Sequence, residues 1–440
     1  MKQKIYKRKR IIPVGWKEIK LGDVFRTSSG STPLSTEKSY YEGGVIPWIN
    51  SGELASPYIY KTSNYITQKG FENSSTELYP KDTVLVAMYG ATAGKASLLK
   101  MEACTNQAIC AILPNEDYCP EFIKYNIDTL YEHLVGLSSG SARDNLSQAG
   151  LKELKLVLPK TKKEQEKLVS VLSLLDRKIE LNRQINDNLE AMAKQLYDYW
   201  FVQFDFPNEE GKPYKSSGGA MVYNEKLKRE IPKGWTAVKI KDVAQTYSGG
   251  TPTSTNSKYY DGGNIPWINS GELNNPIITS TTNYITEEGL NNSSAKLYPQ
   301  DTVLVALYGA TAGKVSLLSF EACSNQAVCG VIPQNKIMTT YIRYYLSSLY
   351  EHFITLSSGS ARDNISQDTI KNTILPIPQE KILKEYSDAV TPIMSKIIAN
   401  QKEMENLTKQ RDELLPLLMN GQASINDNLE EMAKQLYDYW

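Results

Sequence analysis

Histidine is almost absent from this chain, and cysteine is scarce. Only His133 and His352 occur among 440 residues, so a histidine-based catalytic triad or metal cage has very little to work with. The five cysteines form no CxxC pair and no zinc-finger spacing, and an odd number argues against a closed disulfide framework. We therefore expect buried free thiols.

The chain also lacks excess charge and long apolar runs. Its formal net charge is zero, which does not indicate a nucleic-acid-binding protein. It does not exclude one either, because phosphate contacts depend on local patches of charge. The basic start MKQKIYKRKR is followed by no apolar run, so no signal peptide or membrane anchor is expected. A cytoplasmic protein without membrane contact is the expectation.

The sequence is a tandem repeat of two long segments. Ile12-Pro-Val-Gly-Trp16 returns as Ile231-Pro-Lys-Gly-Trp235, an offset of 219 residues that holds for well over a hundred positions. IPWINSGEL starts at Ile46 and again at Ile265. Copies of this length are two domains rather than solenoid repeats. Within each copy, Gly, Ser, Thr and Asn clusters alternate with short apolar strands, which is typical of a mixed, strand-rich α/β domain.

Each copy is followed by a long helical pattern. Residues 164–200 contain no Pro or Gly and carry apolar residues at alternating four-three spacing, the heptad seam of a helix that packs along another helix. At 1.5 Å per residue this helix measures about 55 Å. Residues 381–418 repeat the seam, so we expect the two helices to pair antiparallel, related by a pseudo-twofold axis, with Asn182 meeting Asn400 and fixing their register. The alternative is that both asparagines merely face solvent.

These patterns predict an α+β fold, with two similar mixed α/β domains joined by two long antiparallel coiled-coil helices. The expected organisation is domain 1 (1–160), helix 1 (161–200), a turn-rich connection (201–230), domain 2 (231–379), helix 2 (380–420) and a C-terminal segment (421–440) that repeats residues 185–200.

No motif in the sequence supplies a catalytic centre. GATAGK, at Gly90 and Gly309, has too few residues between its glycines for a phosphate loop, and alanine or valine follows the lysine where Ser or Thr is needed. A tight turn that presents Tyr, Thr and Lys at its tip is favoured instead. An adenine-methyltransferase Asn-Pro-Pro motif is absent, since the chain contains no Pro-Pro. No metal ligands or catalytic residues are therefore assigned.

The polar loops are the candidate binding surface. Arg reads guanine and Asn or Gln reads adenine, while Ser, Thr and backbone amides suit phosphates. The same residues fit a plainer interpretation, because Ser-Gly clusters are common in turns and Arg143 can pair with Asp144. The candidate DNA-binding residues are Thr32, Tyr89, Thr92, Lys95, Asn106, Arg143, Asn145, Thr251, Tyr308, Thr311, Lys314, Asn325, Arg362 and Asn364.

SGGTP, IPWINSGEL, LYGATAGK and CSNQAV, in this order and with close variants in both copies, together with helices of the INDNLEAMAKQLYDYWF kind, resemble the specificity subunit of a type I restriction-modification system. This resemblance implies that each domain reads half of a bipartite target in double-stranded DNA. It also implies that the helices act as a spacer and dock two modification subunits, and that restriction subunits join them. S-adenosylmethionine would then lie on the modification subunits, ATP and Mg on the restriction subunits, and no cofactor in this chain. The docking residues it suggests are Leu189, Met192, Leu196, Tyr197, Trp200, Leu429, Met432, Leu436, Tyr437 and Trp440.

Two features of this sequence differ from the usual pattern of that family. The two domains are close copies, which predicts a nearly palindromic target, although loop differences such as Ser31 against Gly250 could alter a base or two. Residues 425–440 repeat residues 185–200 with one change, Ala191 to Glu431. This repeat either restores a second docking surface or is a recombination remnant.

The alternative from another class is a tandem carbohydrate- or peptide-binding module on a coiled-coil spacer, which 28 tyrosines and zero net charge would tolerate. A self-sufficient nuclease or methyltransferase lacks the motifs. The paired SARDN loops, at Ser141 and Ser360, favour DNA.

Overall fold

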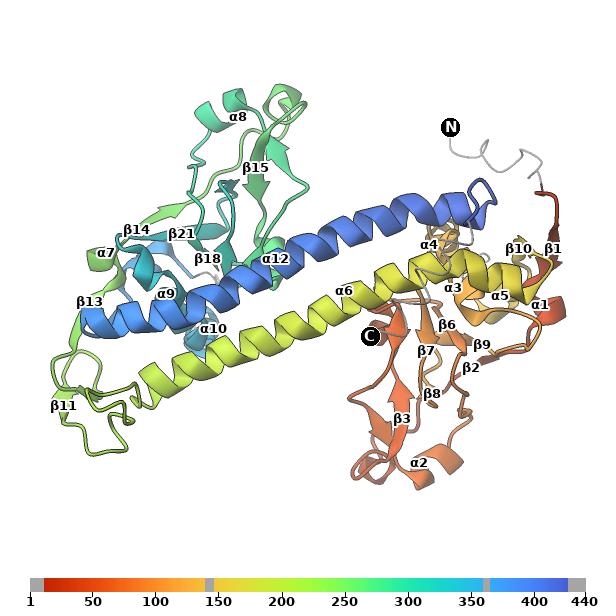
Figure 1. Ribbon diagram of the computed structural model, residues 1–440, viewed down its shortest axis with the longest axis horizontal. Coiled ribbons are helices and arrows are strands. Elements are labelled where there is room, and N and C mark those ends of the chain that lie inside the picture. Colours follow the sequence, from red (N-terminus) through yellow and green to blue (C-terminus); the bar gives the residue numbers. More distant parts are fainter. Residues whose placement is uncertain (1–11, 139–145, 359–364, 426–440) are drawn as a thin grey trace. The chain divides into compact units, whose positions relative to one another are not determined.

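The computed structural model describes residues 12–138, 146–358 and 365–425 (Figure 1). The chain forms two compact units. Unit 1 contains the described residues up to Glu180 and from Glu405 onwards, and unit 2 is Leu181–Met404. Each unit therefore holds one of the two repeated domains and part of both long helices. None of the helices in the described part of the chain has the length and apolar character needed to cross a membrane.

Unit 1 is built on a five-stranded sheet in the order β2-β9-β6-β7-β4 and a three-stranded sheet in the order β5-β3-β8. The strands are β2 (Thr27–Ser29), β3 (Ile46–Ile49), β4 (Tyr58–Ile59), β5 (Tyr65–Ile66), β6 (Val84–Ala87), β7 (Ala96–Leu99), β8 (Cys104–Thr105) and β9 (Ile109–Ile112), and a separate pair joins β1 (Trp16–Lys20) to β10 (Lys155–Pro159). Every residue of β6, β7 and β9 is buried, and all of them are apolar except Ser97 of β7.

Five short helices complete the described part of the domain in unit 1. They are α1 (Leu21–Val24), α2 (Gln68–Glu72), α3 (Pro120–Asp128), α4 (Tyr131–Ser138) and α5 (Gln148–Lys152), with 3-10 turns at Lys38–Tyr40 and Ser51–Ala55. In Figure 1, β3 and α2 lie in the part of unit 1 farthest from the long helix, whereas β6, β7 and β9 lie beside it.

Unit 2 repeats this topology strand for strand. Its sheets have the orders β14-β21-β18-β19-β16 and β17-β15-β20. The strands are β13 (Thr236–Lys239), β14 (Ala244–Ser248), β15 (Ile265–Ile268), β16 (Ile277–Ile278), β17 (Tyr284–Ile285), β18 (Val303–Ala306), β19 (Val315–Leu318), β20 (Cys323–Ser324), β21 (Val328–Pro333) and β22 (Ile374–Ile377). The helices are α7 (Ile240–Val243), α8 (Glu287–Asn291), α9 (Thr339–Ser348), α10 (Tyr350–Ser358) and α11 (Gln367–Asn372), with 3-10 turns at Ser257–Tyr259, Ser270–Asn274 and Lys336–Met338. The α+β fold and the repeat are thus as the sequence predicts.

The connection between the first long helix and domain 2 is more ordered than its turn-rich sequence suggests. A π-helical turn at Asp198–Val202 ends the helix, and β11 (Met221–Asn224) pairs with β12 (Arg229–Pro232). Phe201, Phe204 and Phe206 all pack on Trp235, with ring centroids 5.4 to 6.0 Å apart. These aromatic contacts fix the connection to the start of domain 2.

The long helices are α6 (Lys162–Tyr197) and α12 (Glu380–Met419). Thr161 and Glu164 bond to one another at the start of α6, since the Glu164 N–H donates to the Thr161 hydroxyl at 3.3 Å and that hydroxyl donates to the Glu164 carboxylate at 2.8 Å. This arrangement helps to fix where the helix begins. Gly421, with φ of 67°, lies just after α12 and ends it.

Within unit 2 the two helices run antiparallel. Asn400 donates from its Nδ2 to the Oδ1 of Asn186 at 2.9 Å, and Asn182 donates to Glu403 at 2.9 Å. All three asparagines are buried, so the solvent-facing alternative is wrong. The predicted meeting of Asn182 with Asn400 is also wrong, because the observed register is shifted by four residues, one helical turn, and Asn186 takes the place of Asn182.

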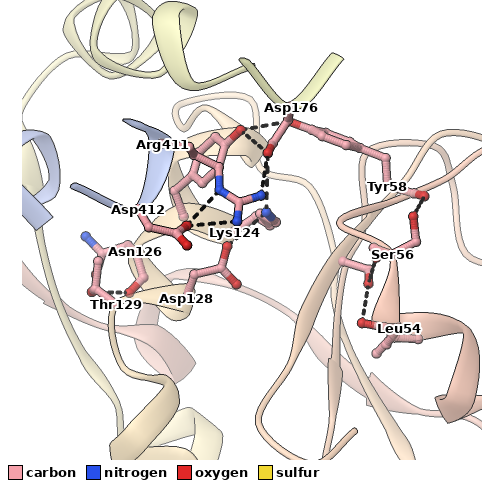
Figure 2. A network of polar contacts seen from close by, with 12 residues as sticks. Leu54, Ser56, Tyr58, Lys124, Asn126, Asp128, Thr129, Asp176, Arg411 and Asp412 are labelled. Atoms are coloured by element: carbon pink, nitrogen blue, oxygen red, sulfur yellow. Dashed lines mark hydrogen bonds and ion pairs between the residues drawn. The ribbon is translucent and has the colours of Figure 1, made fainter. Parts of the chain in front are cut away.

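Unit 1 fastens both helices to its domain through a buried network of charges (Figure 2). Asp176 of α6 accepts hydrogen bonds from Arg411 of α12 at 2.8 Å and from the Tyr125 hydroxyl of α3 at 2.6 Å. Lys124 of α3 lies 2.9 Å from Asp128 and 3.9 Å from Asp176. Burial, together with the charge of Asp176, raises the pKa of the Tyr125 hydroxyl, which keeps it a neutral donor.

Unit 2 has a different network at the equivalent place. Arg343 of α9 corresponds to Lys124 and pairs with Glu190 of α6 through its Nη2 at 2.8 Å, while Tyr344 donates to the same carboxylate at 3.1 Å. The Arg343 side chain is only 3% exposed. Each domain is therefore attached to the helices by a charge pair suited to its own end.

All five cysteines are free and buried, as the sequence predicts. Burial raises the pKa of Cys104 to about 11 and that of Cys110, Cys119, Cys323 and Cys329 to about 12. The thiols are thus protonated at neutral pH and behave as small apolar side chains.

Candidate nucleic-acid interface

Four loops of unit 1 are tied together by hydrogen bonds. The loop after β2 is bound to the loop after β8, because Ser31 donates its N–H to the Thr105 carbonyl at 2.9 Å and Thr32 donates to Gln107 at 2.5 Å. The Trp48 indole N–H holds the Ser31 carbonyl at 3.0 Å. Trp48 therefore acts as a buried support for this surface. We call the loops at 29–34, 50–52, 88–95 and 105–108 the loop cluster of unit 1.

Unit 2 builds the same loop cluster from the equivalent residues. Gly250 donates its N–H to the Ser324 carbonyl at 2.8 Å, and Thr251 donates to Gln326. The Trp267 indole holds the Gly250 carbonyl at 3.0 Å. A Cβ at Gly249 would lie 2.2 Å from the Asn325 carbonyl oxygen, so only glycine allows the loops to approach this closely.

The GATAGK segments are tight turns between buried strands, as predicted. Gly90 and Gly94 adopt φ of 90° and 82° between β6 and β7. The predicted exposure of the threonines at the tip is wrong, however. Thr92 is buried and donates to the Ser51 carbonyl at 2.7 Å, and Thr311 donates to the Ser270 carbonyl at 3.0 Å. These hydroxyls join the turn to its neighbouring loop rather than facing a ligand.

The remaining residues of the turns are more accessible, and they differ between the units. Tyr89 is 49% exposed, whereas Tyr308 is half-buried against the core of unit 2. Lys314 donates to Asn274 at 2.5 Å, but alanine replaces that asparagine in unit 1, at Ala55. Lys95 and Lys314 are both half-buried.

Asn106 and Asn325 point into their own loops. The Asn106 Oδ1 accepts the Ala108 N–H at 3.1 Å, and its Nδ2 lies 3.4 Å from the Asn50 Oδ1. The neighbouring glutamines, Gln107 and Gln326, are the exposed members of each pair. These glutamines are not among the residues predicted to bind DNA. The bond from the Asn side chain to the N–H two residues later is visible only in the structure, because every residue except proline offers such an N–H.

Arg143, Asn145, Arg362 and Asn364 lie outside the described residues. The chain that follows them is anchored beside the loop clusters, since Gln148 donates to the Thr27 carbonyl at 2.8 Å and Gln367 donates to the Thr246 carbonyl at 2.7 Å. Both glutamines thus hold the start of α5 or α11 against the strand that leads into the loop cluster.

The candidate docking residues of α6 are divided between two faces. Tyr197 and Trp200 are buried in the core of unit 2, and Leu189 and Leu196 pack partly against it, which removes the first two from any surface that a partner could reach in this structure. Met192, in contrast, is 54% exposed. Leu429, Met432, Leu436, Tyr437 and Trp440 lie outside the described residues.

The chain thus contains two repeated domains with the same hydrogen-bonded loop cluster, together with two long helices, which is the architecture of a protein with two equivalent surfaces. The described part of the chain contains no group of three or more His, Cys, Asp or Glu side chains that could hold a metal ion. The family model for the type I restriction modification DNA specificity domain matches residues 13–191 and 232–409, and the chain belongs to this family.

Individual relatives agree with this assignment. The chain is 30% identical to the specificity subunit of the type I restriction enzyme MjaIX of Methanocaldococcus jannaschii, over 94% of this chain and 95% of the relative. It is 25% identical to the HindI specificity subunit of Haemophilus influenzae, over 92% and 99% of the two chains. The crystal structure of a type I restriction-modification S subunit from M. genitalium shares the fold, with a TM-score of 0.57, 17% identity and coverage of 94% and 97%.

Proposed function

We propose that this chain is the DNA-reading subunit of a type I restriction-modification complex, and that each domain reads one half of a bipartite target. The observation that carries the proposal is the family match over both domains, each of which presents the same hydrogen-bonded loop cluster. No observation favours the carbohydrate- or peptide-binding alternative. The chemistry would lie on partner subunits, with S-adenosylmethionine on the modification subunits and ATP and Mg on the restriction subunits.

The loop clusters suit base reading because their polar groups are held in place before binding. Thr32 and Gln107 fix one another in unit 1, as Thr251 and Gln326 do in unit 2. An amide held in this way loses little conformational entropy when it binds a base edge. Thr92, Thr311, Asn106 and Asn325 would act indirectly, by fixing the loops that carry these groups.

The repetition of exposed residues supports a nearly palindromic target. The exposed pair Thr32–Gln107 is identical to Thr251–Gln326, and these residues would read the same bases in both half-sites. Some surface positions differ, notably Leu34 against Thr253, Val45 against Asn264 and Tyr60 against Thr279. Such differences would shift one or two bases at the edge of a half-site and leave its centre unchanged.

Mapping methylated adenines across the genome of a cell that expresses the complex is therefore expected to show an interrupted target with two inverted, nearly identical halves.

Gln107→Ala should relax the base preference at one position in one half-site, and Gln326→Ala should relax it at the matching position in the other. Each substitution should reduce discrimination against the wrong base by about 1 to 3 kcal/mol. Asn73→Ala, an exposed amide that caps the Lys69 carbonyl, serves as the control and should leave the target unchanged. Two unrelated half-sites would disprove the hypothesis of a nearly palindromic target.

We also propose that the outer face of α6 docks a modification subunit. Ile185 and Met192 of α6 and Tyr199 of the π-helical turn that follows it are 41%, 54% and 38% exposed and recur every seven residues, which places Ile185 and Met192 on one face of α6. An apolar stripe of this kind on a charged helix is typical of an interface between helices. Tyr197 and Trp200, on the inner face, would support this surface from within.

Met192→Lys together with Tyr199→Lys is expected to weaken binding of the modification subunit at least tenfold, about 1.4 kcal/mol or more, because both changes place charge in an apolar contact. Titration calorimetry with the purified modification subunit measures this loss. Asp187→Lys, at an exposed position on a different face of the same helix, changes the net charge by the same amount and is the matched control. Equal affinities for the two variants would place the docking surface elsewhere.

A further inference from the structure

The helical segment 185–200 fills a receptor surface inside unit 2. Ala193, Tyr197 and Trp200 are buried there. The Tyr197 ring lies 5.7 Å from Tyr344 of α9, and the Trp200 ring lies 5.8 Å from Tyr386 of α12. We call the surface formed by α9 and the first half of α12 the unit 2 receptor.

The unit 2 receptor also forms specific polar contacts with the segment that fills it. Asn400 donates to Asn186 at 2.9 Å, and Asn186 in turn donates to the Ile397 carbonyl at 3.2 Å. Arg343 is almost fully buried and receives its carboxylate from Glu190 at 2.8 Å. A segment that fills this receptor must therefore bring an amide, a carboxylate and two aromatic rings at fixed spacing.

Residues 425–440 bring all of these groups in the same order. Asn426, Glu430, Ala433, Tyr437 and Trp440 stand where the first copy has Asn186, Glu190, Ala193, Tyr197 and Trp200. The single difference, Glu431 in place of Ala191, falls at an exposed position. We propose that residues 425–440 are a second ligand for the unit 2 receptor and that they occupy it in another copy of this chain, in exchange for that copy's residues 185–200.

The segment does not reach the receptor of its own chain. Asn400 lies 19 residues before the end of α12 at Met419, about 28 Å along the helix. The seven residues from Met419 to Asn426 span at most about 25 Å when fully extended, and the separation between two packed helices adds to the distance required. Exchange between two chains is the arrangement that keeps α12 intact.

The equivalent place in unit 1 does not suit the segment. Lys124, the counterpart of Arg343, already has two carboxylates, Asp128 and Asp176. Asp176 is completed by Arg411 of α12. Glu430 would add a third carboxylate beside Lys124, whereas Arg343 needs the carboxylate that Glu430 offers.

Two features oppose the exchange and keep it a minor state in the free chain. Residues 185–200 are attached to the receptor they fill, which gives them a high effective concentration. Ile425 is buried in the core of unit 1, although its counterpart Ile185 is exposed, so moving the segment uncovers an apolar side chain. Detecting the exchange therefore requires a covalent trap.

The trap uses cysteines at Asn400 and Asn426 in the full-length chain. If residues 425–440 replace residues 185–200, these two positions face one another as Asn400 and Asn186 do, and oxidised glutathione should produce a disulfide-linked dimer. The control is Asn400→Cys with Asn428→Cys, because position 428 corresponds to the exposed Asn188. We expect at least tenfold more covalent dimer from the first variant than from the control on a non-reducing gel. The native thiols are all buried and contribute little background.

Absence of the dimer, or equal amounts from both variants, would overturn the proposal. A second measurement does not depend on how the cysteine variants fold. A fluorescein-labelled peptide with the sequence of residues 425–440 is expected to bind the unmodified chain at least tenfold more tightly than a peptide carrying Tyr437→Ala and Trp440→Ala. Equal anisotropy titrations for the two peptides would equally overturn the proposal.

Discussion

Replacing Glu190 with alanine is expected to destabilise unit 2 by about 3 to 5 kcal/mol, because the substitution leaves the buried Arg343 guanidinium without its carboxylate. Arg343 then keeps the Pro276 carbonyl at 3.3 Å, the Met394 Sδ at 3.9 Å and the face of Tyr344, with its guanidinium carbon 4.7 Å from the ring centroid, and none of these is a carboxylate. None of these groups carries a full negative charge. Chemical denaturation followed by tryptophan fluorescence measures the loss, since Trp200 and Trp235 lie in the core of this unit.

Two comparison variants separate the buried pair from an ordinary surface pair. Lys194→Ala removes the exposed partner of Asp198 on the same helix and should change stability by less than about 1 kcal/mol. Glu190→Met combined with Arg343→Met replaces the pair by apolar groups and should recover most of the loss. If Glu190→Ala cost no more than Lys194→Ala, the pair would not anchor domain 2 to α6.

Replacing both Asn186 and Asn400 with leucine is expected to raise the melting temperature, because a buried polar pair gives way to apolar packing between the helices. Asn400→Leu alone should instead lower stability by about 1 to 3 kcal/mol, since the Asn186 oxygen loses its donor inside the interface. The opposite signs of the single and double variants are the signature of a matched polar pair, and a double-mutant cycle measures their coupling.

The same double variant tests whether the asparagines set the register of the helices. Distances between spin labels on the exposed faces of α6 and α12 should broaden in the double leucine variant if the pair fixes alignment. Asn188→Leu, at an exposed position, serves as the control and should change neither melting temperature nor distances. A single narrow distance in the double variant would show that the apolar seam alone sets the register.

Features that depend on interactions within one short segment were predicted well from the sequence. The repeat offset placed both domains, and the heptad spacing placed both helices to within a few residues of α6 and α12. Buried strands such as β6 and β18 were visible as apolar runs between turn residues. These features depend on periodicity and composition, which a single segment carries by itself.

Side-chain direction inside the loops was predicted less well. Thr92 and Asn106 look like surface residues because they are polar and lie between strands, yet both bind neighbouring loops. Their partners, Ser51 and Asn50, are 41 and 56 residues away in sequence. A contact at that separation leaves no periodic trace, so the residue type alone does not reveal which way the side chain points.

Tyr197 and Trp200 were predicted to lie on a docking surface, and that prediction failed for a similar reason. Tyr197 and Trp200 belong to an aromatic motif that resembles a docking site, but Tyr341 and Tyr344 of domain 2 and Tyr386 of α12 cover them. Heptad spacing shows that an apolar stripe exists; it does not show whether the chain's own domain or another protein packs on it.

By itself, the sequence of this specificity-family chain determined the two domains, the two helices and the likeness between them, because repetition and hydrophobic periodicity are written in the order of residues. The tertiary structure decided which asparagines pair, which charges are buried together and which face of α6 stays exposed. These outcomes depend on a one-turn shift in helix register and on contacts between distant segments, whose energies exist only once the chain has folded.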